Sequence, residues 1–305
     1  MNRFILIILA VSFPLLVPGQ MLSLSDHYIY DALSINPSFA GCHDALSATI
    51  SYRNQWVGFK DAPKSNILSI HTPFDNDRIG LGLLVEKNSI GIYKETSFIG
   101  NYSYRIHLHD GKLSLGLGFG ATVYNIAWNE LEAADPDDVL LLTAPKAAVL
   151  PDFSLGAYYY AKKYFIGFSM PLFLGHELDE STGKYRISSN FSGSNFFLTG
   201  GYEVGLSSNV KLLPSMLLKY HPGNVIQVDC YAQFNLKDRI WVGAGYRNRN
   251  MLIGMLQCQL NYQLRMAYSF DYQFGSIGKY VNDSHEIVLS YVFRYARNVI
   301  SPRNF

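Results

Sequence analysis

The chain has 305 residues, of which 49% are hydrophobic and only 16% are charged, and its formal net charge is +1. This balance excludes a general affinity for nucleic acid, and the charged fraction is lower than that of an ordinary soluble domain. After residue 19 no apolar run approaches the length of a membrane-spanning helix. The apolar residues are instead spread through the whole chain.

The first 19 residues have the features of a secretory signal peptide. Arg3 supplies the positive charge, residues 4–17 form the apolar core, and Gly19 is a small residue at the expected cleavage site. Pro14 and Pro18 interrupt the stretch, which argues against a retained helix. We therefore expect cleavage after residue 19 and an exported protein. A lipid anchor is not expected, because no cysteine follows the cleavage site.

From residue 46 onward, apolar and polar residues alternate in short segments. Between Leu113 and Val123, for example, Leu and Phe alternate with Ser and Gly. A period of two residues predicts strands, and clusters of Gly, Pro, Asn and Asp divide them. About fourteen strands are predicted, near 46–54, 66–74, 78–88, 95–107, 112–125, 152–161, 163–171, 194–205, 209–220, 224–235, 239–247, 251–260, 263–274 and 285–295.

The lengths of the connections give the predicted strands an orientation. Connections after even-numbered strands are tight turns, and those after odd-numbered strands are mostly longer, as at 55–65, 89–94, 126–151, 172–193 and 275–284. Short periplasmic turns and long extracellular loops, with many aromatic residues, are typical of outer-membrane β-barrels. We therefore predict an all-β fold, a transmembrane antiparallel up-and-down barrel of about 14 strands. It would occupy residues 46–295, contact outer-membrane lipid, and leave residues 296–305 as a C-terminal tail.

Residues 20–45 precede the predicted barrel and have no clean period. We expect an N-terminal segment that starts on the periplasmic side and lies under the barrel mouth or folds into it as a plug; a flexible leader is the alternative. Side chains alone do not fill a barrel of this size, so water or polypeptide must occupy it. Gly116, Gly118 and Gly120 would leave room there. They do not suit a dinucleotide loop, because no helix follows them.

The polar faces of the later strands are predicted to line the lumen. These faces carry Gln227, Asp229, Gln233, Asn235, Arg247, Arg249, Gln257, Gln259, Asn261 and Arg265. An open porin and a plugged scaffold both predict this lining. The three cysteines argue against a disulfide framework because their number is odd. Cys230 and Cys258 share strand faces with apolar residues, so we expect them to face lipid.

Several motifs along the chain point to one family. They include residues 33–41 (LSINPSFAG), 52–58 (YRNQWVG), 68–73 (LSIHTP) and 284–287 (SHEI). In this order they resemble the PorP/SprF family of type IX secretion and gliding-motility membrane proteins. The resemblance implies a non-enzymatic outer-membrane component that supports export or cell-surface attachment of cargo. Its partners would be type IX secretion components and the C-terminal domain of a secreted cargo or surface adhesin. A passive porin or solute channel is the alternative.

The most distinctive motif lies at the outer end of the first predicted strand and in the loop that follows. The candidate contacts with a partner or cargo are Arg53, Asn54, Gln55, Trp56, Pro63 and Lys64. An interfacial tryptophan belt with a hydrogen-bond network in the lumen is the alternative for the first four. An ordinary rigid turn is the alternative for the last two.

Other chemistry is only weakly indicated. An outer-membrane hydrolase would need a nucleophile beside a histidine. His71 and His285 each have a serine nearby in the sequence, but nothing fixes either pair into a triad. The carboxylates of residues 135–138 lack the glycine and distal glutamate of a calcium loop, so a solvated turn is favoured. We therefore expect no enzymatic activity, no metal and no cofactor.

Overall fold

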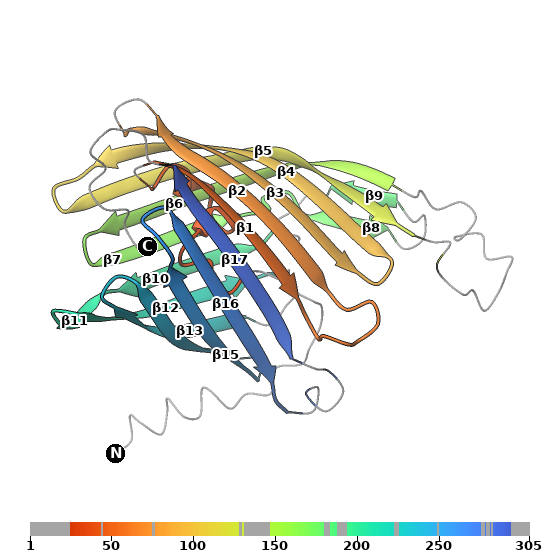
Figure 1. Cartoon of the computed structure of the whole chain (residues 1–305). Helices are drawn as coiled ribbons and strands as arrows, with labels where there is room; N and C mark the ends of the chain where they lie inside the picture. The colour runs from red at the N-terminus through yellow and green to blue at the C-terminus, as the bar shows by residue number, and fades with distance from the viewer. Residues whose placement is uncertain are drawn as a thin grey trace, which may run out of the picture.

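The fold is a closed antiparallel barrel (Figure 1). The computed structural model describes residues 25–43, 45–74, 77–127, 130, 147–179, 184–187, 194–222, 226–248, 250–275, 278, 281 and 283–293. Fifteen strands form one sheet, which closes because β10 pairs with both β7 and β12. β10 and β11 lie one after the other along β12, so they count as one position in a 14-strand wall. The predicted barrel is confirmed.

The wall strands agree closely with the predicted ones. In chain order they are β1 (Leu46–Asn54), β2 (Lys64–Phe74), β3 (Ile79–Ile90), β4 (Tyr93–His107), β5 (Gly111–Ile126), β6 (Ala147–Ala161), β7 (Tyr164–Met170), β10 (Phe196–Tyr202), β11 (Val204–Ser207), β12 (Val210–Tyr220), β13 (Gln227–Leu236), β14 (Ile240–Arg247), β15 (Met251–Gln259), β16 (Leu264–Gln273) and β17 (Ser284–Phe293). Two short 3-10 helices, η1 (Ala32–Ser34) and η2 (Pro37–Phe39), precede them. No helix within the described residues is long and apolar enough to cross a membrane.

The two ends of the barrel differ in their connections. At one end, here called the turn end, every connection has two to four residues; at the other, the loop end, they reach 127–146 and 171–195. Three expectations about the loops were wrong. The loop expected at 89–94 is a two-residue turn, because β3 and β4 continue their pairing to Ile90 and Tyr93. Lys64 belongs to β2, and the loop expected at 172–193 contains a hairpin of β8 (His176–Asp179) and β9 (Lys184–Ile187).

The apolar side chains of the wall point outward. In β5, Leu115, Leu117 and Phe119 are 45%, 57% and 63% exposed, whereas Gly116 and Gly118 between them are buried on the lumen side. Cys230, as expected, is exposed on the outer face. An outward apolar band with a polar interior is the arrangement that a barrel in lipid requires.

The N-terminal segment, residues 25–43, lies inside the barrel, where Figure 1 draws it in red among the strands. Side-chain caps begin its helices: Asp31 accepts a hydrogen bond from the Leu33 amide, and Asn36 accepts one from the Ser38 amide. Tyr28, Leu33, Ile35 and Phe39 of this segment are among the most buried side chains of the protein; with wall residues they form a core inside the lumen.

The N-terminal segment runs along the length of the lumen. Its first described residue, Ser25, contacts Glu286 near the loop end. Its other end lies at the turn end, where Gly41 packs against Thr72 and Pro73 of β2. We expected a start on the periplasmic side, but residue 25 lies near the loop end instead. The signal peptide and the C-terminal tail lie outside the described residues, and the domain boundaries remain predictions.

If the outer face of the wall lies against lipid, the energetic cost of a charge on this face should depend strongly on its depth in the membrane. Leu117→Arg would place a charge near the middle of the outer face of β5, so we expect it to lower the free energy of unfolding by about 2–4 kcal/mol. Leu108→Arg, in the turn after β4, serves as the matched control and should cost only about 0–1 kcal/mol. Denaturant unfolding in lipid vesicles measures both values. Equal costs at the two positions would contradict the assignment.

Candidate functional site

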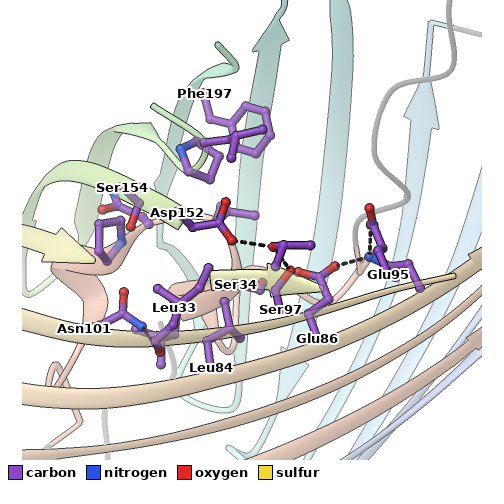
Figure 2. A pocket seen from close by; sticks show the side chains of 18 of the residues that line it. Leu33, Ser34, Leu84, Glu86, Glu95, Ser97, Asn101, Asp152, Ser154 and Phe197 are labelled. Carbon is purple, nitrogen blue, oxygen red and sulfur yellow. Dashed lines mark hydrogen bonds between the residues drawn. The ribbon is translucent and has the colours of Figure 1, made fainter. Parts of the chain in front are cut away.

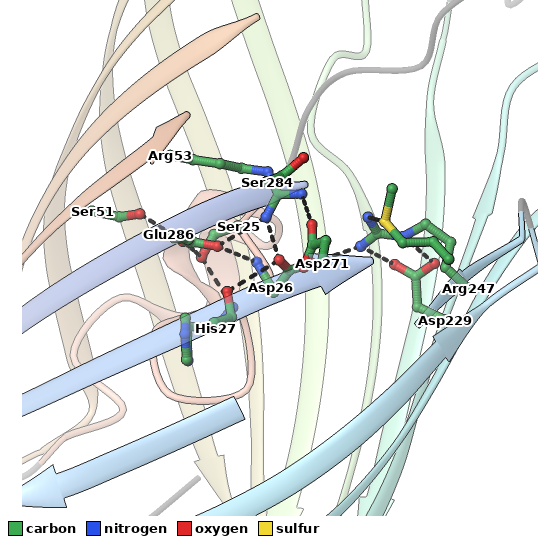
Figure 3. Close-up of polar contacts among 12 residues, drawn as sticks. Ser25, Asp26, His27, Ser51, Arg53, Asp229, Arg247, Asp271, Ser284 and Glu286 are labelled. Atoms are coloured by element: carbon green, nitrogen blue, oxygen red, sulfur yellow. Dashed lines mark hydrogen bonds and ion pairs between the residues drawn. The ribbon is translucent and has the colours of Figure 1, made fainter. Parts of the chain in front are cut away.

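An ion network at the loop end of the lumen is centred on Arg53. This side chain extends inward from β1, and its guanidinium forms ion pairs with Asp26, Asp271 and Glu286. The distance to Glu286 is 3.3 Å. All four side chains are at most 2% exposed, and Figure 3 shows the three carboxylates gathered around the guanidinium. Arg53 therefore joins two neighbouring wall strands to the N-terminal segment.

Asp26 extends the network to a second cluster. Its carboxylate lies 2.8 Å from Arg247, which is 2.9 Å from Asp229, and Lys219 lies 3.2 Å from Asp229. Burial alone would raise the pKa of Asp26, but the guanidinium groups of Arg53 and Arg247 hold this pKa below its usual range. Asp26 is therefore ionised and binds both arginines at once.

The wall residues of the network lie at equivalent heights. They come from six strands, and each lies within three residues of the loop end of its strand. They are Arg53, Lys219, Asp229, Arg247, Asp271 and Glu286. Removing one partner of a buried ion pair costs about 3–5 kcal/mol, because the remaining charge stays buried without compensation. The network therefore fixes the start of the N-terminal segment against half of the wall.

Glycines on the opposite half of the wall let the segment approach the backbone. A Cβ atom added at Gly80, Gly116 or Gly156 would fall well inside van der Waals contact with the N-terminal segment, at Ala40, Ser38 and Asn36 respectively. The expectation that the lumen glycine at 116 leaves room for this segment is therefore confirmed. Only glycine permits such a close approach.

Hydrogen bonds from the wall hold the segment in this glycine-lined groove. Ser103 donates to the carbonyl of Ala40 at 2.7 Å, and Ser114 donates to the carbonyl of Ser38 at 2.6 Å. In the other direction, the side-chain Nδ2 of Asn36 donates to the carbonyls of Ala157 and Phe168 in the wall at 3.2 and 3.3 Å. These bonds satisfy polar groups of the segment, including backbone carbonyls, that would otherwise be buried without partners.

The predicted contact residues do not form one surface. Arg53 is buried in the lumen, whereas Lys64 is exposed. Gln55, Trp56 and Pro63 are half-buried at the base of the loop, as is Asn54, the last residue of β1. There the Gln55 amide donates to the carbonyl of Pro63 at 3.0 Å. A role of these residues in binding a partner remains a prediction.

The two serine–histidine pairs have other partners. Ser69 donates to Asp31, and Nδ1 of His71 accepts from the Gly41 amide at 3.2 Å. His285 contacts the hydroxyl of Tyr268 at 2.6 Å. Within the described residues, no three His, Cys, Asp or Glu side chains are placed to hold a metal ion. The carboxylates at 135–138 lie outside the described residues.

Sequence reasoning missed Asp26, the residue that connects the two arginines. The polar strand faces indicated the wall partners, since Asp229, Arg247, Asp271 and Glu286 all alternate with apolar residues. Asp26 lies in a segment without a period. Its only signal in the sequence was a carboxylate beside a mainly apolar stretch without the alternation of a strand.

These features together define a β-barrel of the bacterial outer membrane whose lumen holds its own N-terminal segment. The model of the type IX secretion system membrane protein PorP/SprF family matches residues 19–291, so the chain belongs to this family. This confirms the resemblance seen in the sequence motifs.

Solved structures of outer-membrane proteins are similar to this chain at low sequence identity. A deletion mutant of TodX, a monoaromatic hydrocarbon channel, is 11% identical with a TM-score of 0.51, and the match covers 87% of this chain and 94% of that chain. The outer membrane protein Omp33 of Acinetobacter baumannii is 7% identical with a TM-score of 0.49, covering 83% and 100% of the two chains. At 11% identity, the TodX likeness shows the fold alone. No individually curated protein matches the chain significantly.

The close approach at Gly116 can be tested through the reactivity of Cys42. This residue is 6% exposed, and burial raises the pKa of its thiol to about 12. In a background with Cys230 and Cys258 changed to Ser, a maleimide reagent should label Cys42 very slowly, because the thiolate is the reactive form. Gly116→Val should displace the N-terminal segment and speed the labelling at least several-fold. Gly100→Val is the matched control, since a Cβ there would meet nothing closer than 3.7 Å. Rapid labelling of Cys42 in this background, without either glycine substitution, would contradict the structure.

Proposed function

We propose that this chain is a non-enzymatic component of type IX protein secretion, of the gliding-motility type. It supports export or cell-surface attachment of cargo proteins by engaging their C-terminal signal domains. The observation that carries the proposal is the occupied lumen. A network of seven buried ion-pairing side chains and a glycine-lined groove hold residues 25–43 inside the barrel, which suits a docking scaffold better than a diffusion path. Membership of the PorP/SprF family supports the same role.

The loop end offers the surface on which cargo would dock. The connection 55–63 is anchored at its base, where the Val57 amide donates to the carbonyl of Asp283 at 3.0 Å. Phe59, near the centre of this connection, is 55% exposed, and Lys64, which follows the connection as the first residue of β2, is exposed as well. An anchored loop with an exposed aromatic side chain is suited to recognising a folded domain, because aromatic residues carry much of the binding energy at protein interfaces. Trp56 and Pro63 would support this loop.

The absence of enzymatic activity is part of the proposal. His71 binds the backbone of the N-terminal segment, and Ser69 binds Asp31 of the same segment. Both side chains therefore have structural partners. To act as a base and a nucleophile, they would first have to break these hydrogen bonds. This arrangement supports a binding role for the lumen instead of hydrolysis.

A passive porin or solute channel is the second candidate, and the barrel architecture favours it. A porin needs a continuous aqueous path through the lumen. Core side chains from the segment and the wall meet inside the lumen, with Phe39 and Leu217 both 0% exposed. The occupied lumen therefore weighs against this candidate.

A strain that lacks this chain tests the proposed function. We expect at least one type IX cargo to be lost from the cell surface and to accumulate inside the envelope. Complementation with Phe59→Ser should restore display several-fold less well than complementation with the unchanged chain. Phe74→Ser, which alters an aromatic residue 61% exposed at the turn end, is the matched control and should restore display fully. Normal display of every type IX cargo in the deletion strain would refute the proposed function.

A further inference from the structure

A cleft lies in the lumen opposite the ion network, between the N-terminal segment and strands β3–β6 (Figure 2). Leu33, Asn36 and Pro37 of the segment form one side. The wall side carries three carboxylates, those of Glu86, Glu95 and Asp152. Glu86 and Glu95 are half-buried, so solvent reaches the cleft; we call it the acidic cleft.

The first two carboxylates are held in place by a shared amide. Nδ2 of Asn88 donates to Oε1 of Glu86 at 3.0 Å and to Oε1 of Glu95 at 2.9 Å. The side-chain oxygen of Asn88 in turn accepts a hydrogen bond from Ser65. This arrangement positions two carboxylates side by side, although two negative charges at such a distance repel each other.

The third carboxylate has a free oxygen. Asp152 is 2% exposed, and its Oδ2 accepts a hydrogen bond from Thr122, but its Oδ1 has no hydrogen-bond partner among the described residues. Nε2 of His176 lies 3.5 Å from this oxygen, but it donates to the carbonyl of Pro151 at 3.1 Å instead. A buried carboxylate oxygen without a donor is costly, so it indicates a missing partner in the cleft.

The acidic cleft differs from the ion network in its lack of cations. Every carboxylate of the ion network contacts an arginine or a lysine. In the acidic cleft, within the part of the chain that the structure describes, neither Lys nor Arg lines the wall. The N-terminal segment cannot supply one, because residues 25–43 contain neither amino acid.

We propose that the acidic cleft binds an arginine side chain of the polypeptide that the barrel engages. A guanidinium presents five donors in a planar fork that matches carboxylate oxygens. It would reach the free Oδ1 of Asp152 and the carboxylates bridged by Asn88. Phe197 and Tyr124 also line the cleft, and aromatic rings favour a cation over their faces. The identity of that polypeptide as a type IX partner rests on the proposed function.

Binding of a small probe to the purified full-length mature protein in detergent tests the cleft by itself. The probe is acetyl-arginine methylamide, and the neutral isostere acetyl-citrulline methylamide is its control; ligand-observed NMR detects weak binding of both. We expect the arginine probe to bind and the citrulline probe not to bind. Glu86→Gln combined with Glu95→Gln should weaken binding about tenfold or more, because charge-assisted hydrogen bonds are lost. Asp152→Asn should weaken it as well.

The controls separate charge from folding. Asp110→Asn, in the exposed turn after β4, removes a carboxylate outside the cleft and should leave binding unchanged. Heat-modifiable migration in gels confirms that each variant retains its barrel. The proposal is overturned if the arginine probe fails to bind the unchanged protein, if citrulline binds equally well, or if folded cleft variants bind as before. Arginine binding together with normal cargo display in the deletion strain would retain the cleft but refute the type IX role.

Discussion

The guanidinium of Arg53 lies between carboxylates from two wall strands and from the N-terminal segment, so one buried cation joins residues as far apart in sequence as 53 and 286. Three carboxylates around one guanidinium compensate the cost of taking it out of water, provided that all remain in place. Asp26 repeats this pairing with Arg247. The position of the segment therefore depends on charges that the wall holds near its loop end.

The two faces of the barrel wall suit two different environments, the outside of the barrel and its lumen. Its outer face exposes apolar side chains such as Leu117, and its inner face carries ion pairs on one half and glycines such as Gly116 on the other. The ion network binds the start of the N-terminal segment, and the glycines allow the rest of the segment to pack closely against the wall. The acidic cleft occupies a part of the lumen that neither arrangement fills. An occupied interior with such a cleft is more consistent with recognition of a polypeptide than with free diffusion of solutes.

Period-two alternation is a local signal, so the sequence was enough to predict nearly every wall strand and which end of the barrel carries the tight turns. Strand ends depend on the partner strand, which is why the extension of β3 and β4 and the place of Lys64 in β2 could not be predicted. The β8–β9 hairpin was missed because it lies apart from the wall sheet. The lumen glycines indicated an occupant, but the pairing of Asp26 with Arg53 and Arg247 depends on contacts that no local pattern reports.

Ion conductance across planar lipid bilayers tests most directly whether the N-terminal segment closes the lumen. The mature protein should show no steady open-pore current, because the core around Phe39 leaves no continuous aqueous path. A variant that lacks residues 25–43 but still forms a barrel should conduct, because side chains alone do not fill a barrel of 14 strands. A steady current through the mature protein, equal to that of the shortened variant, would contradict the account.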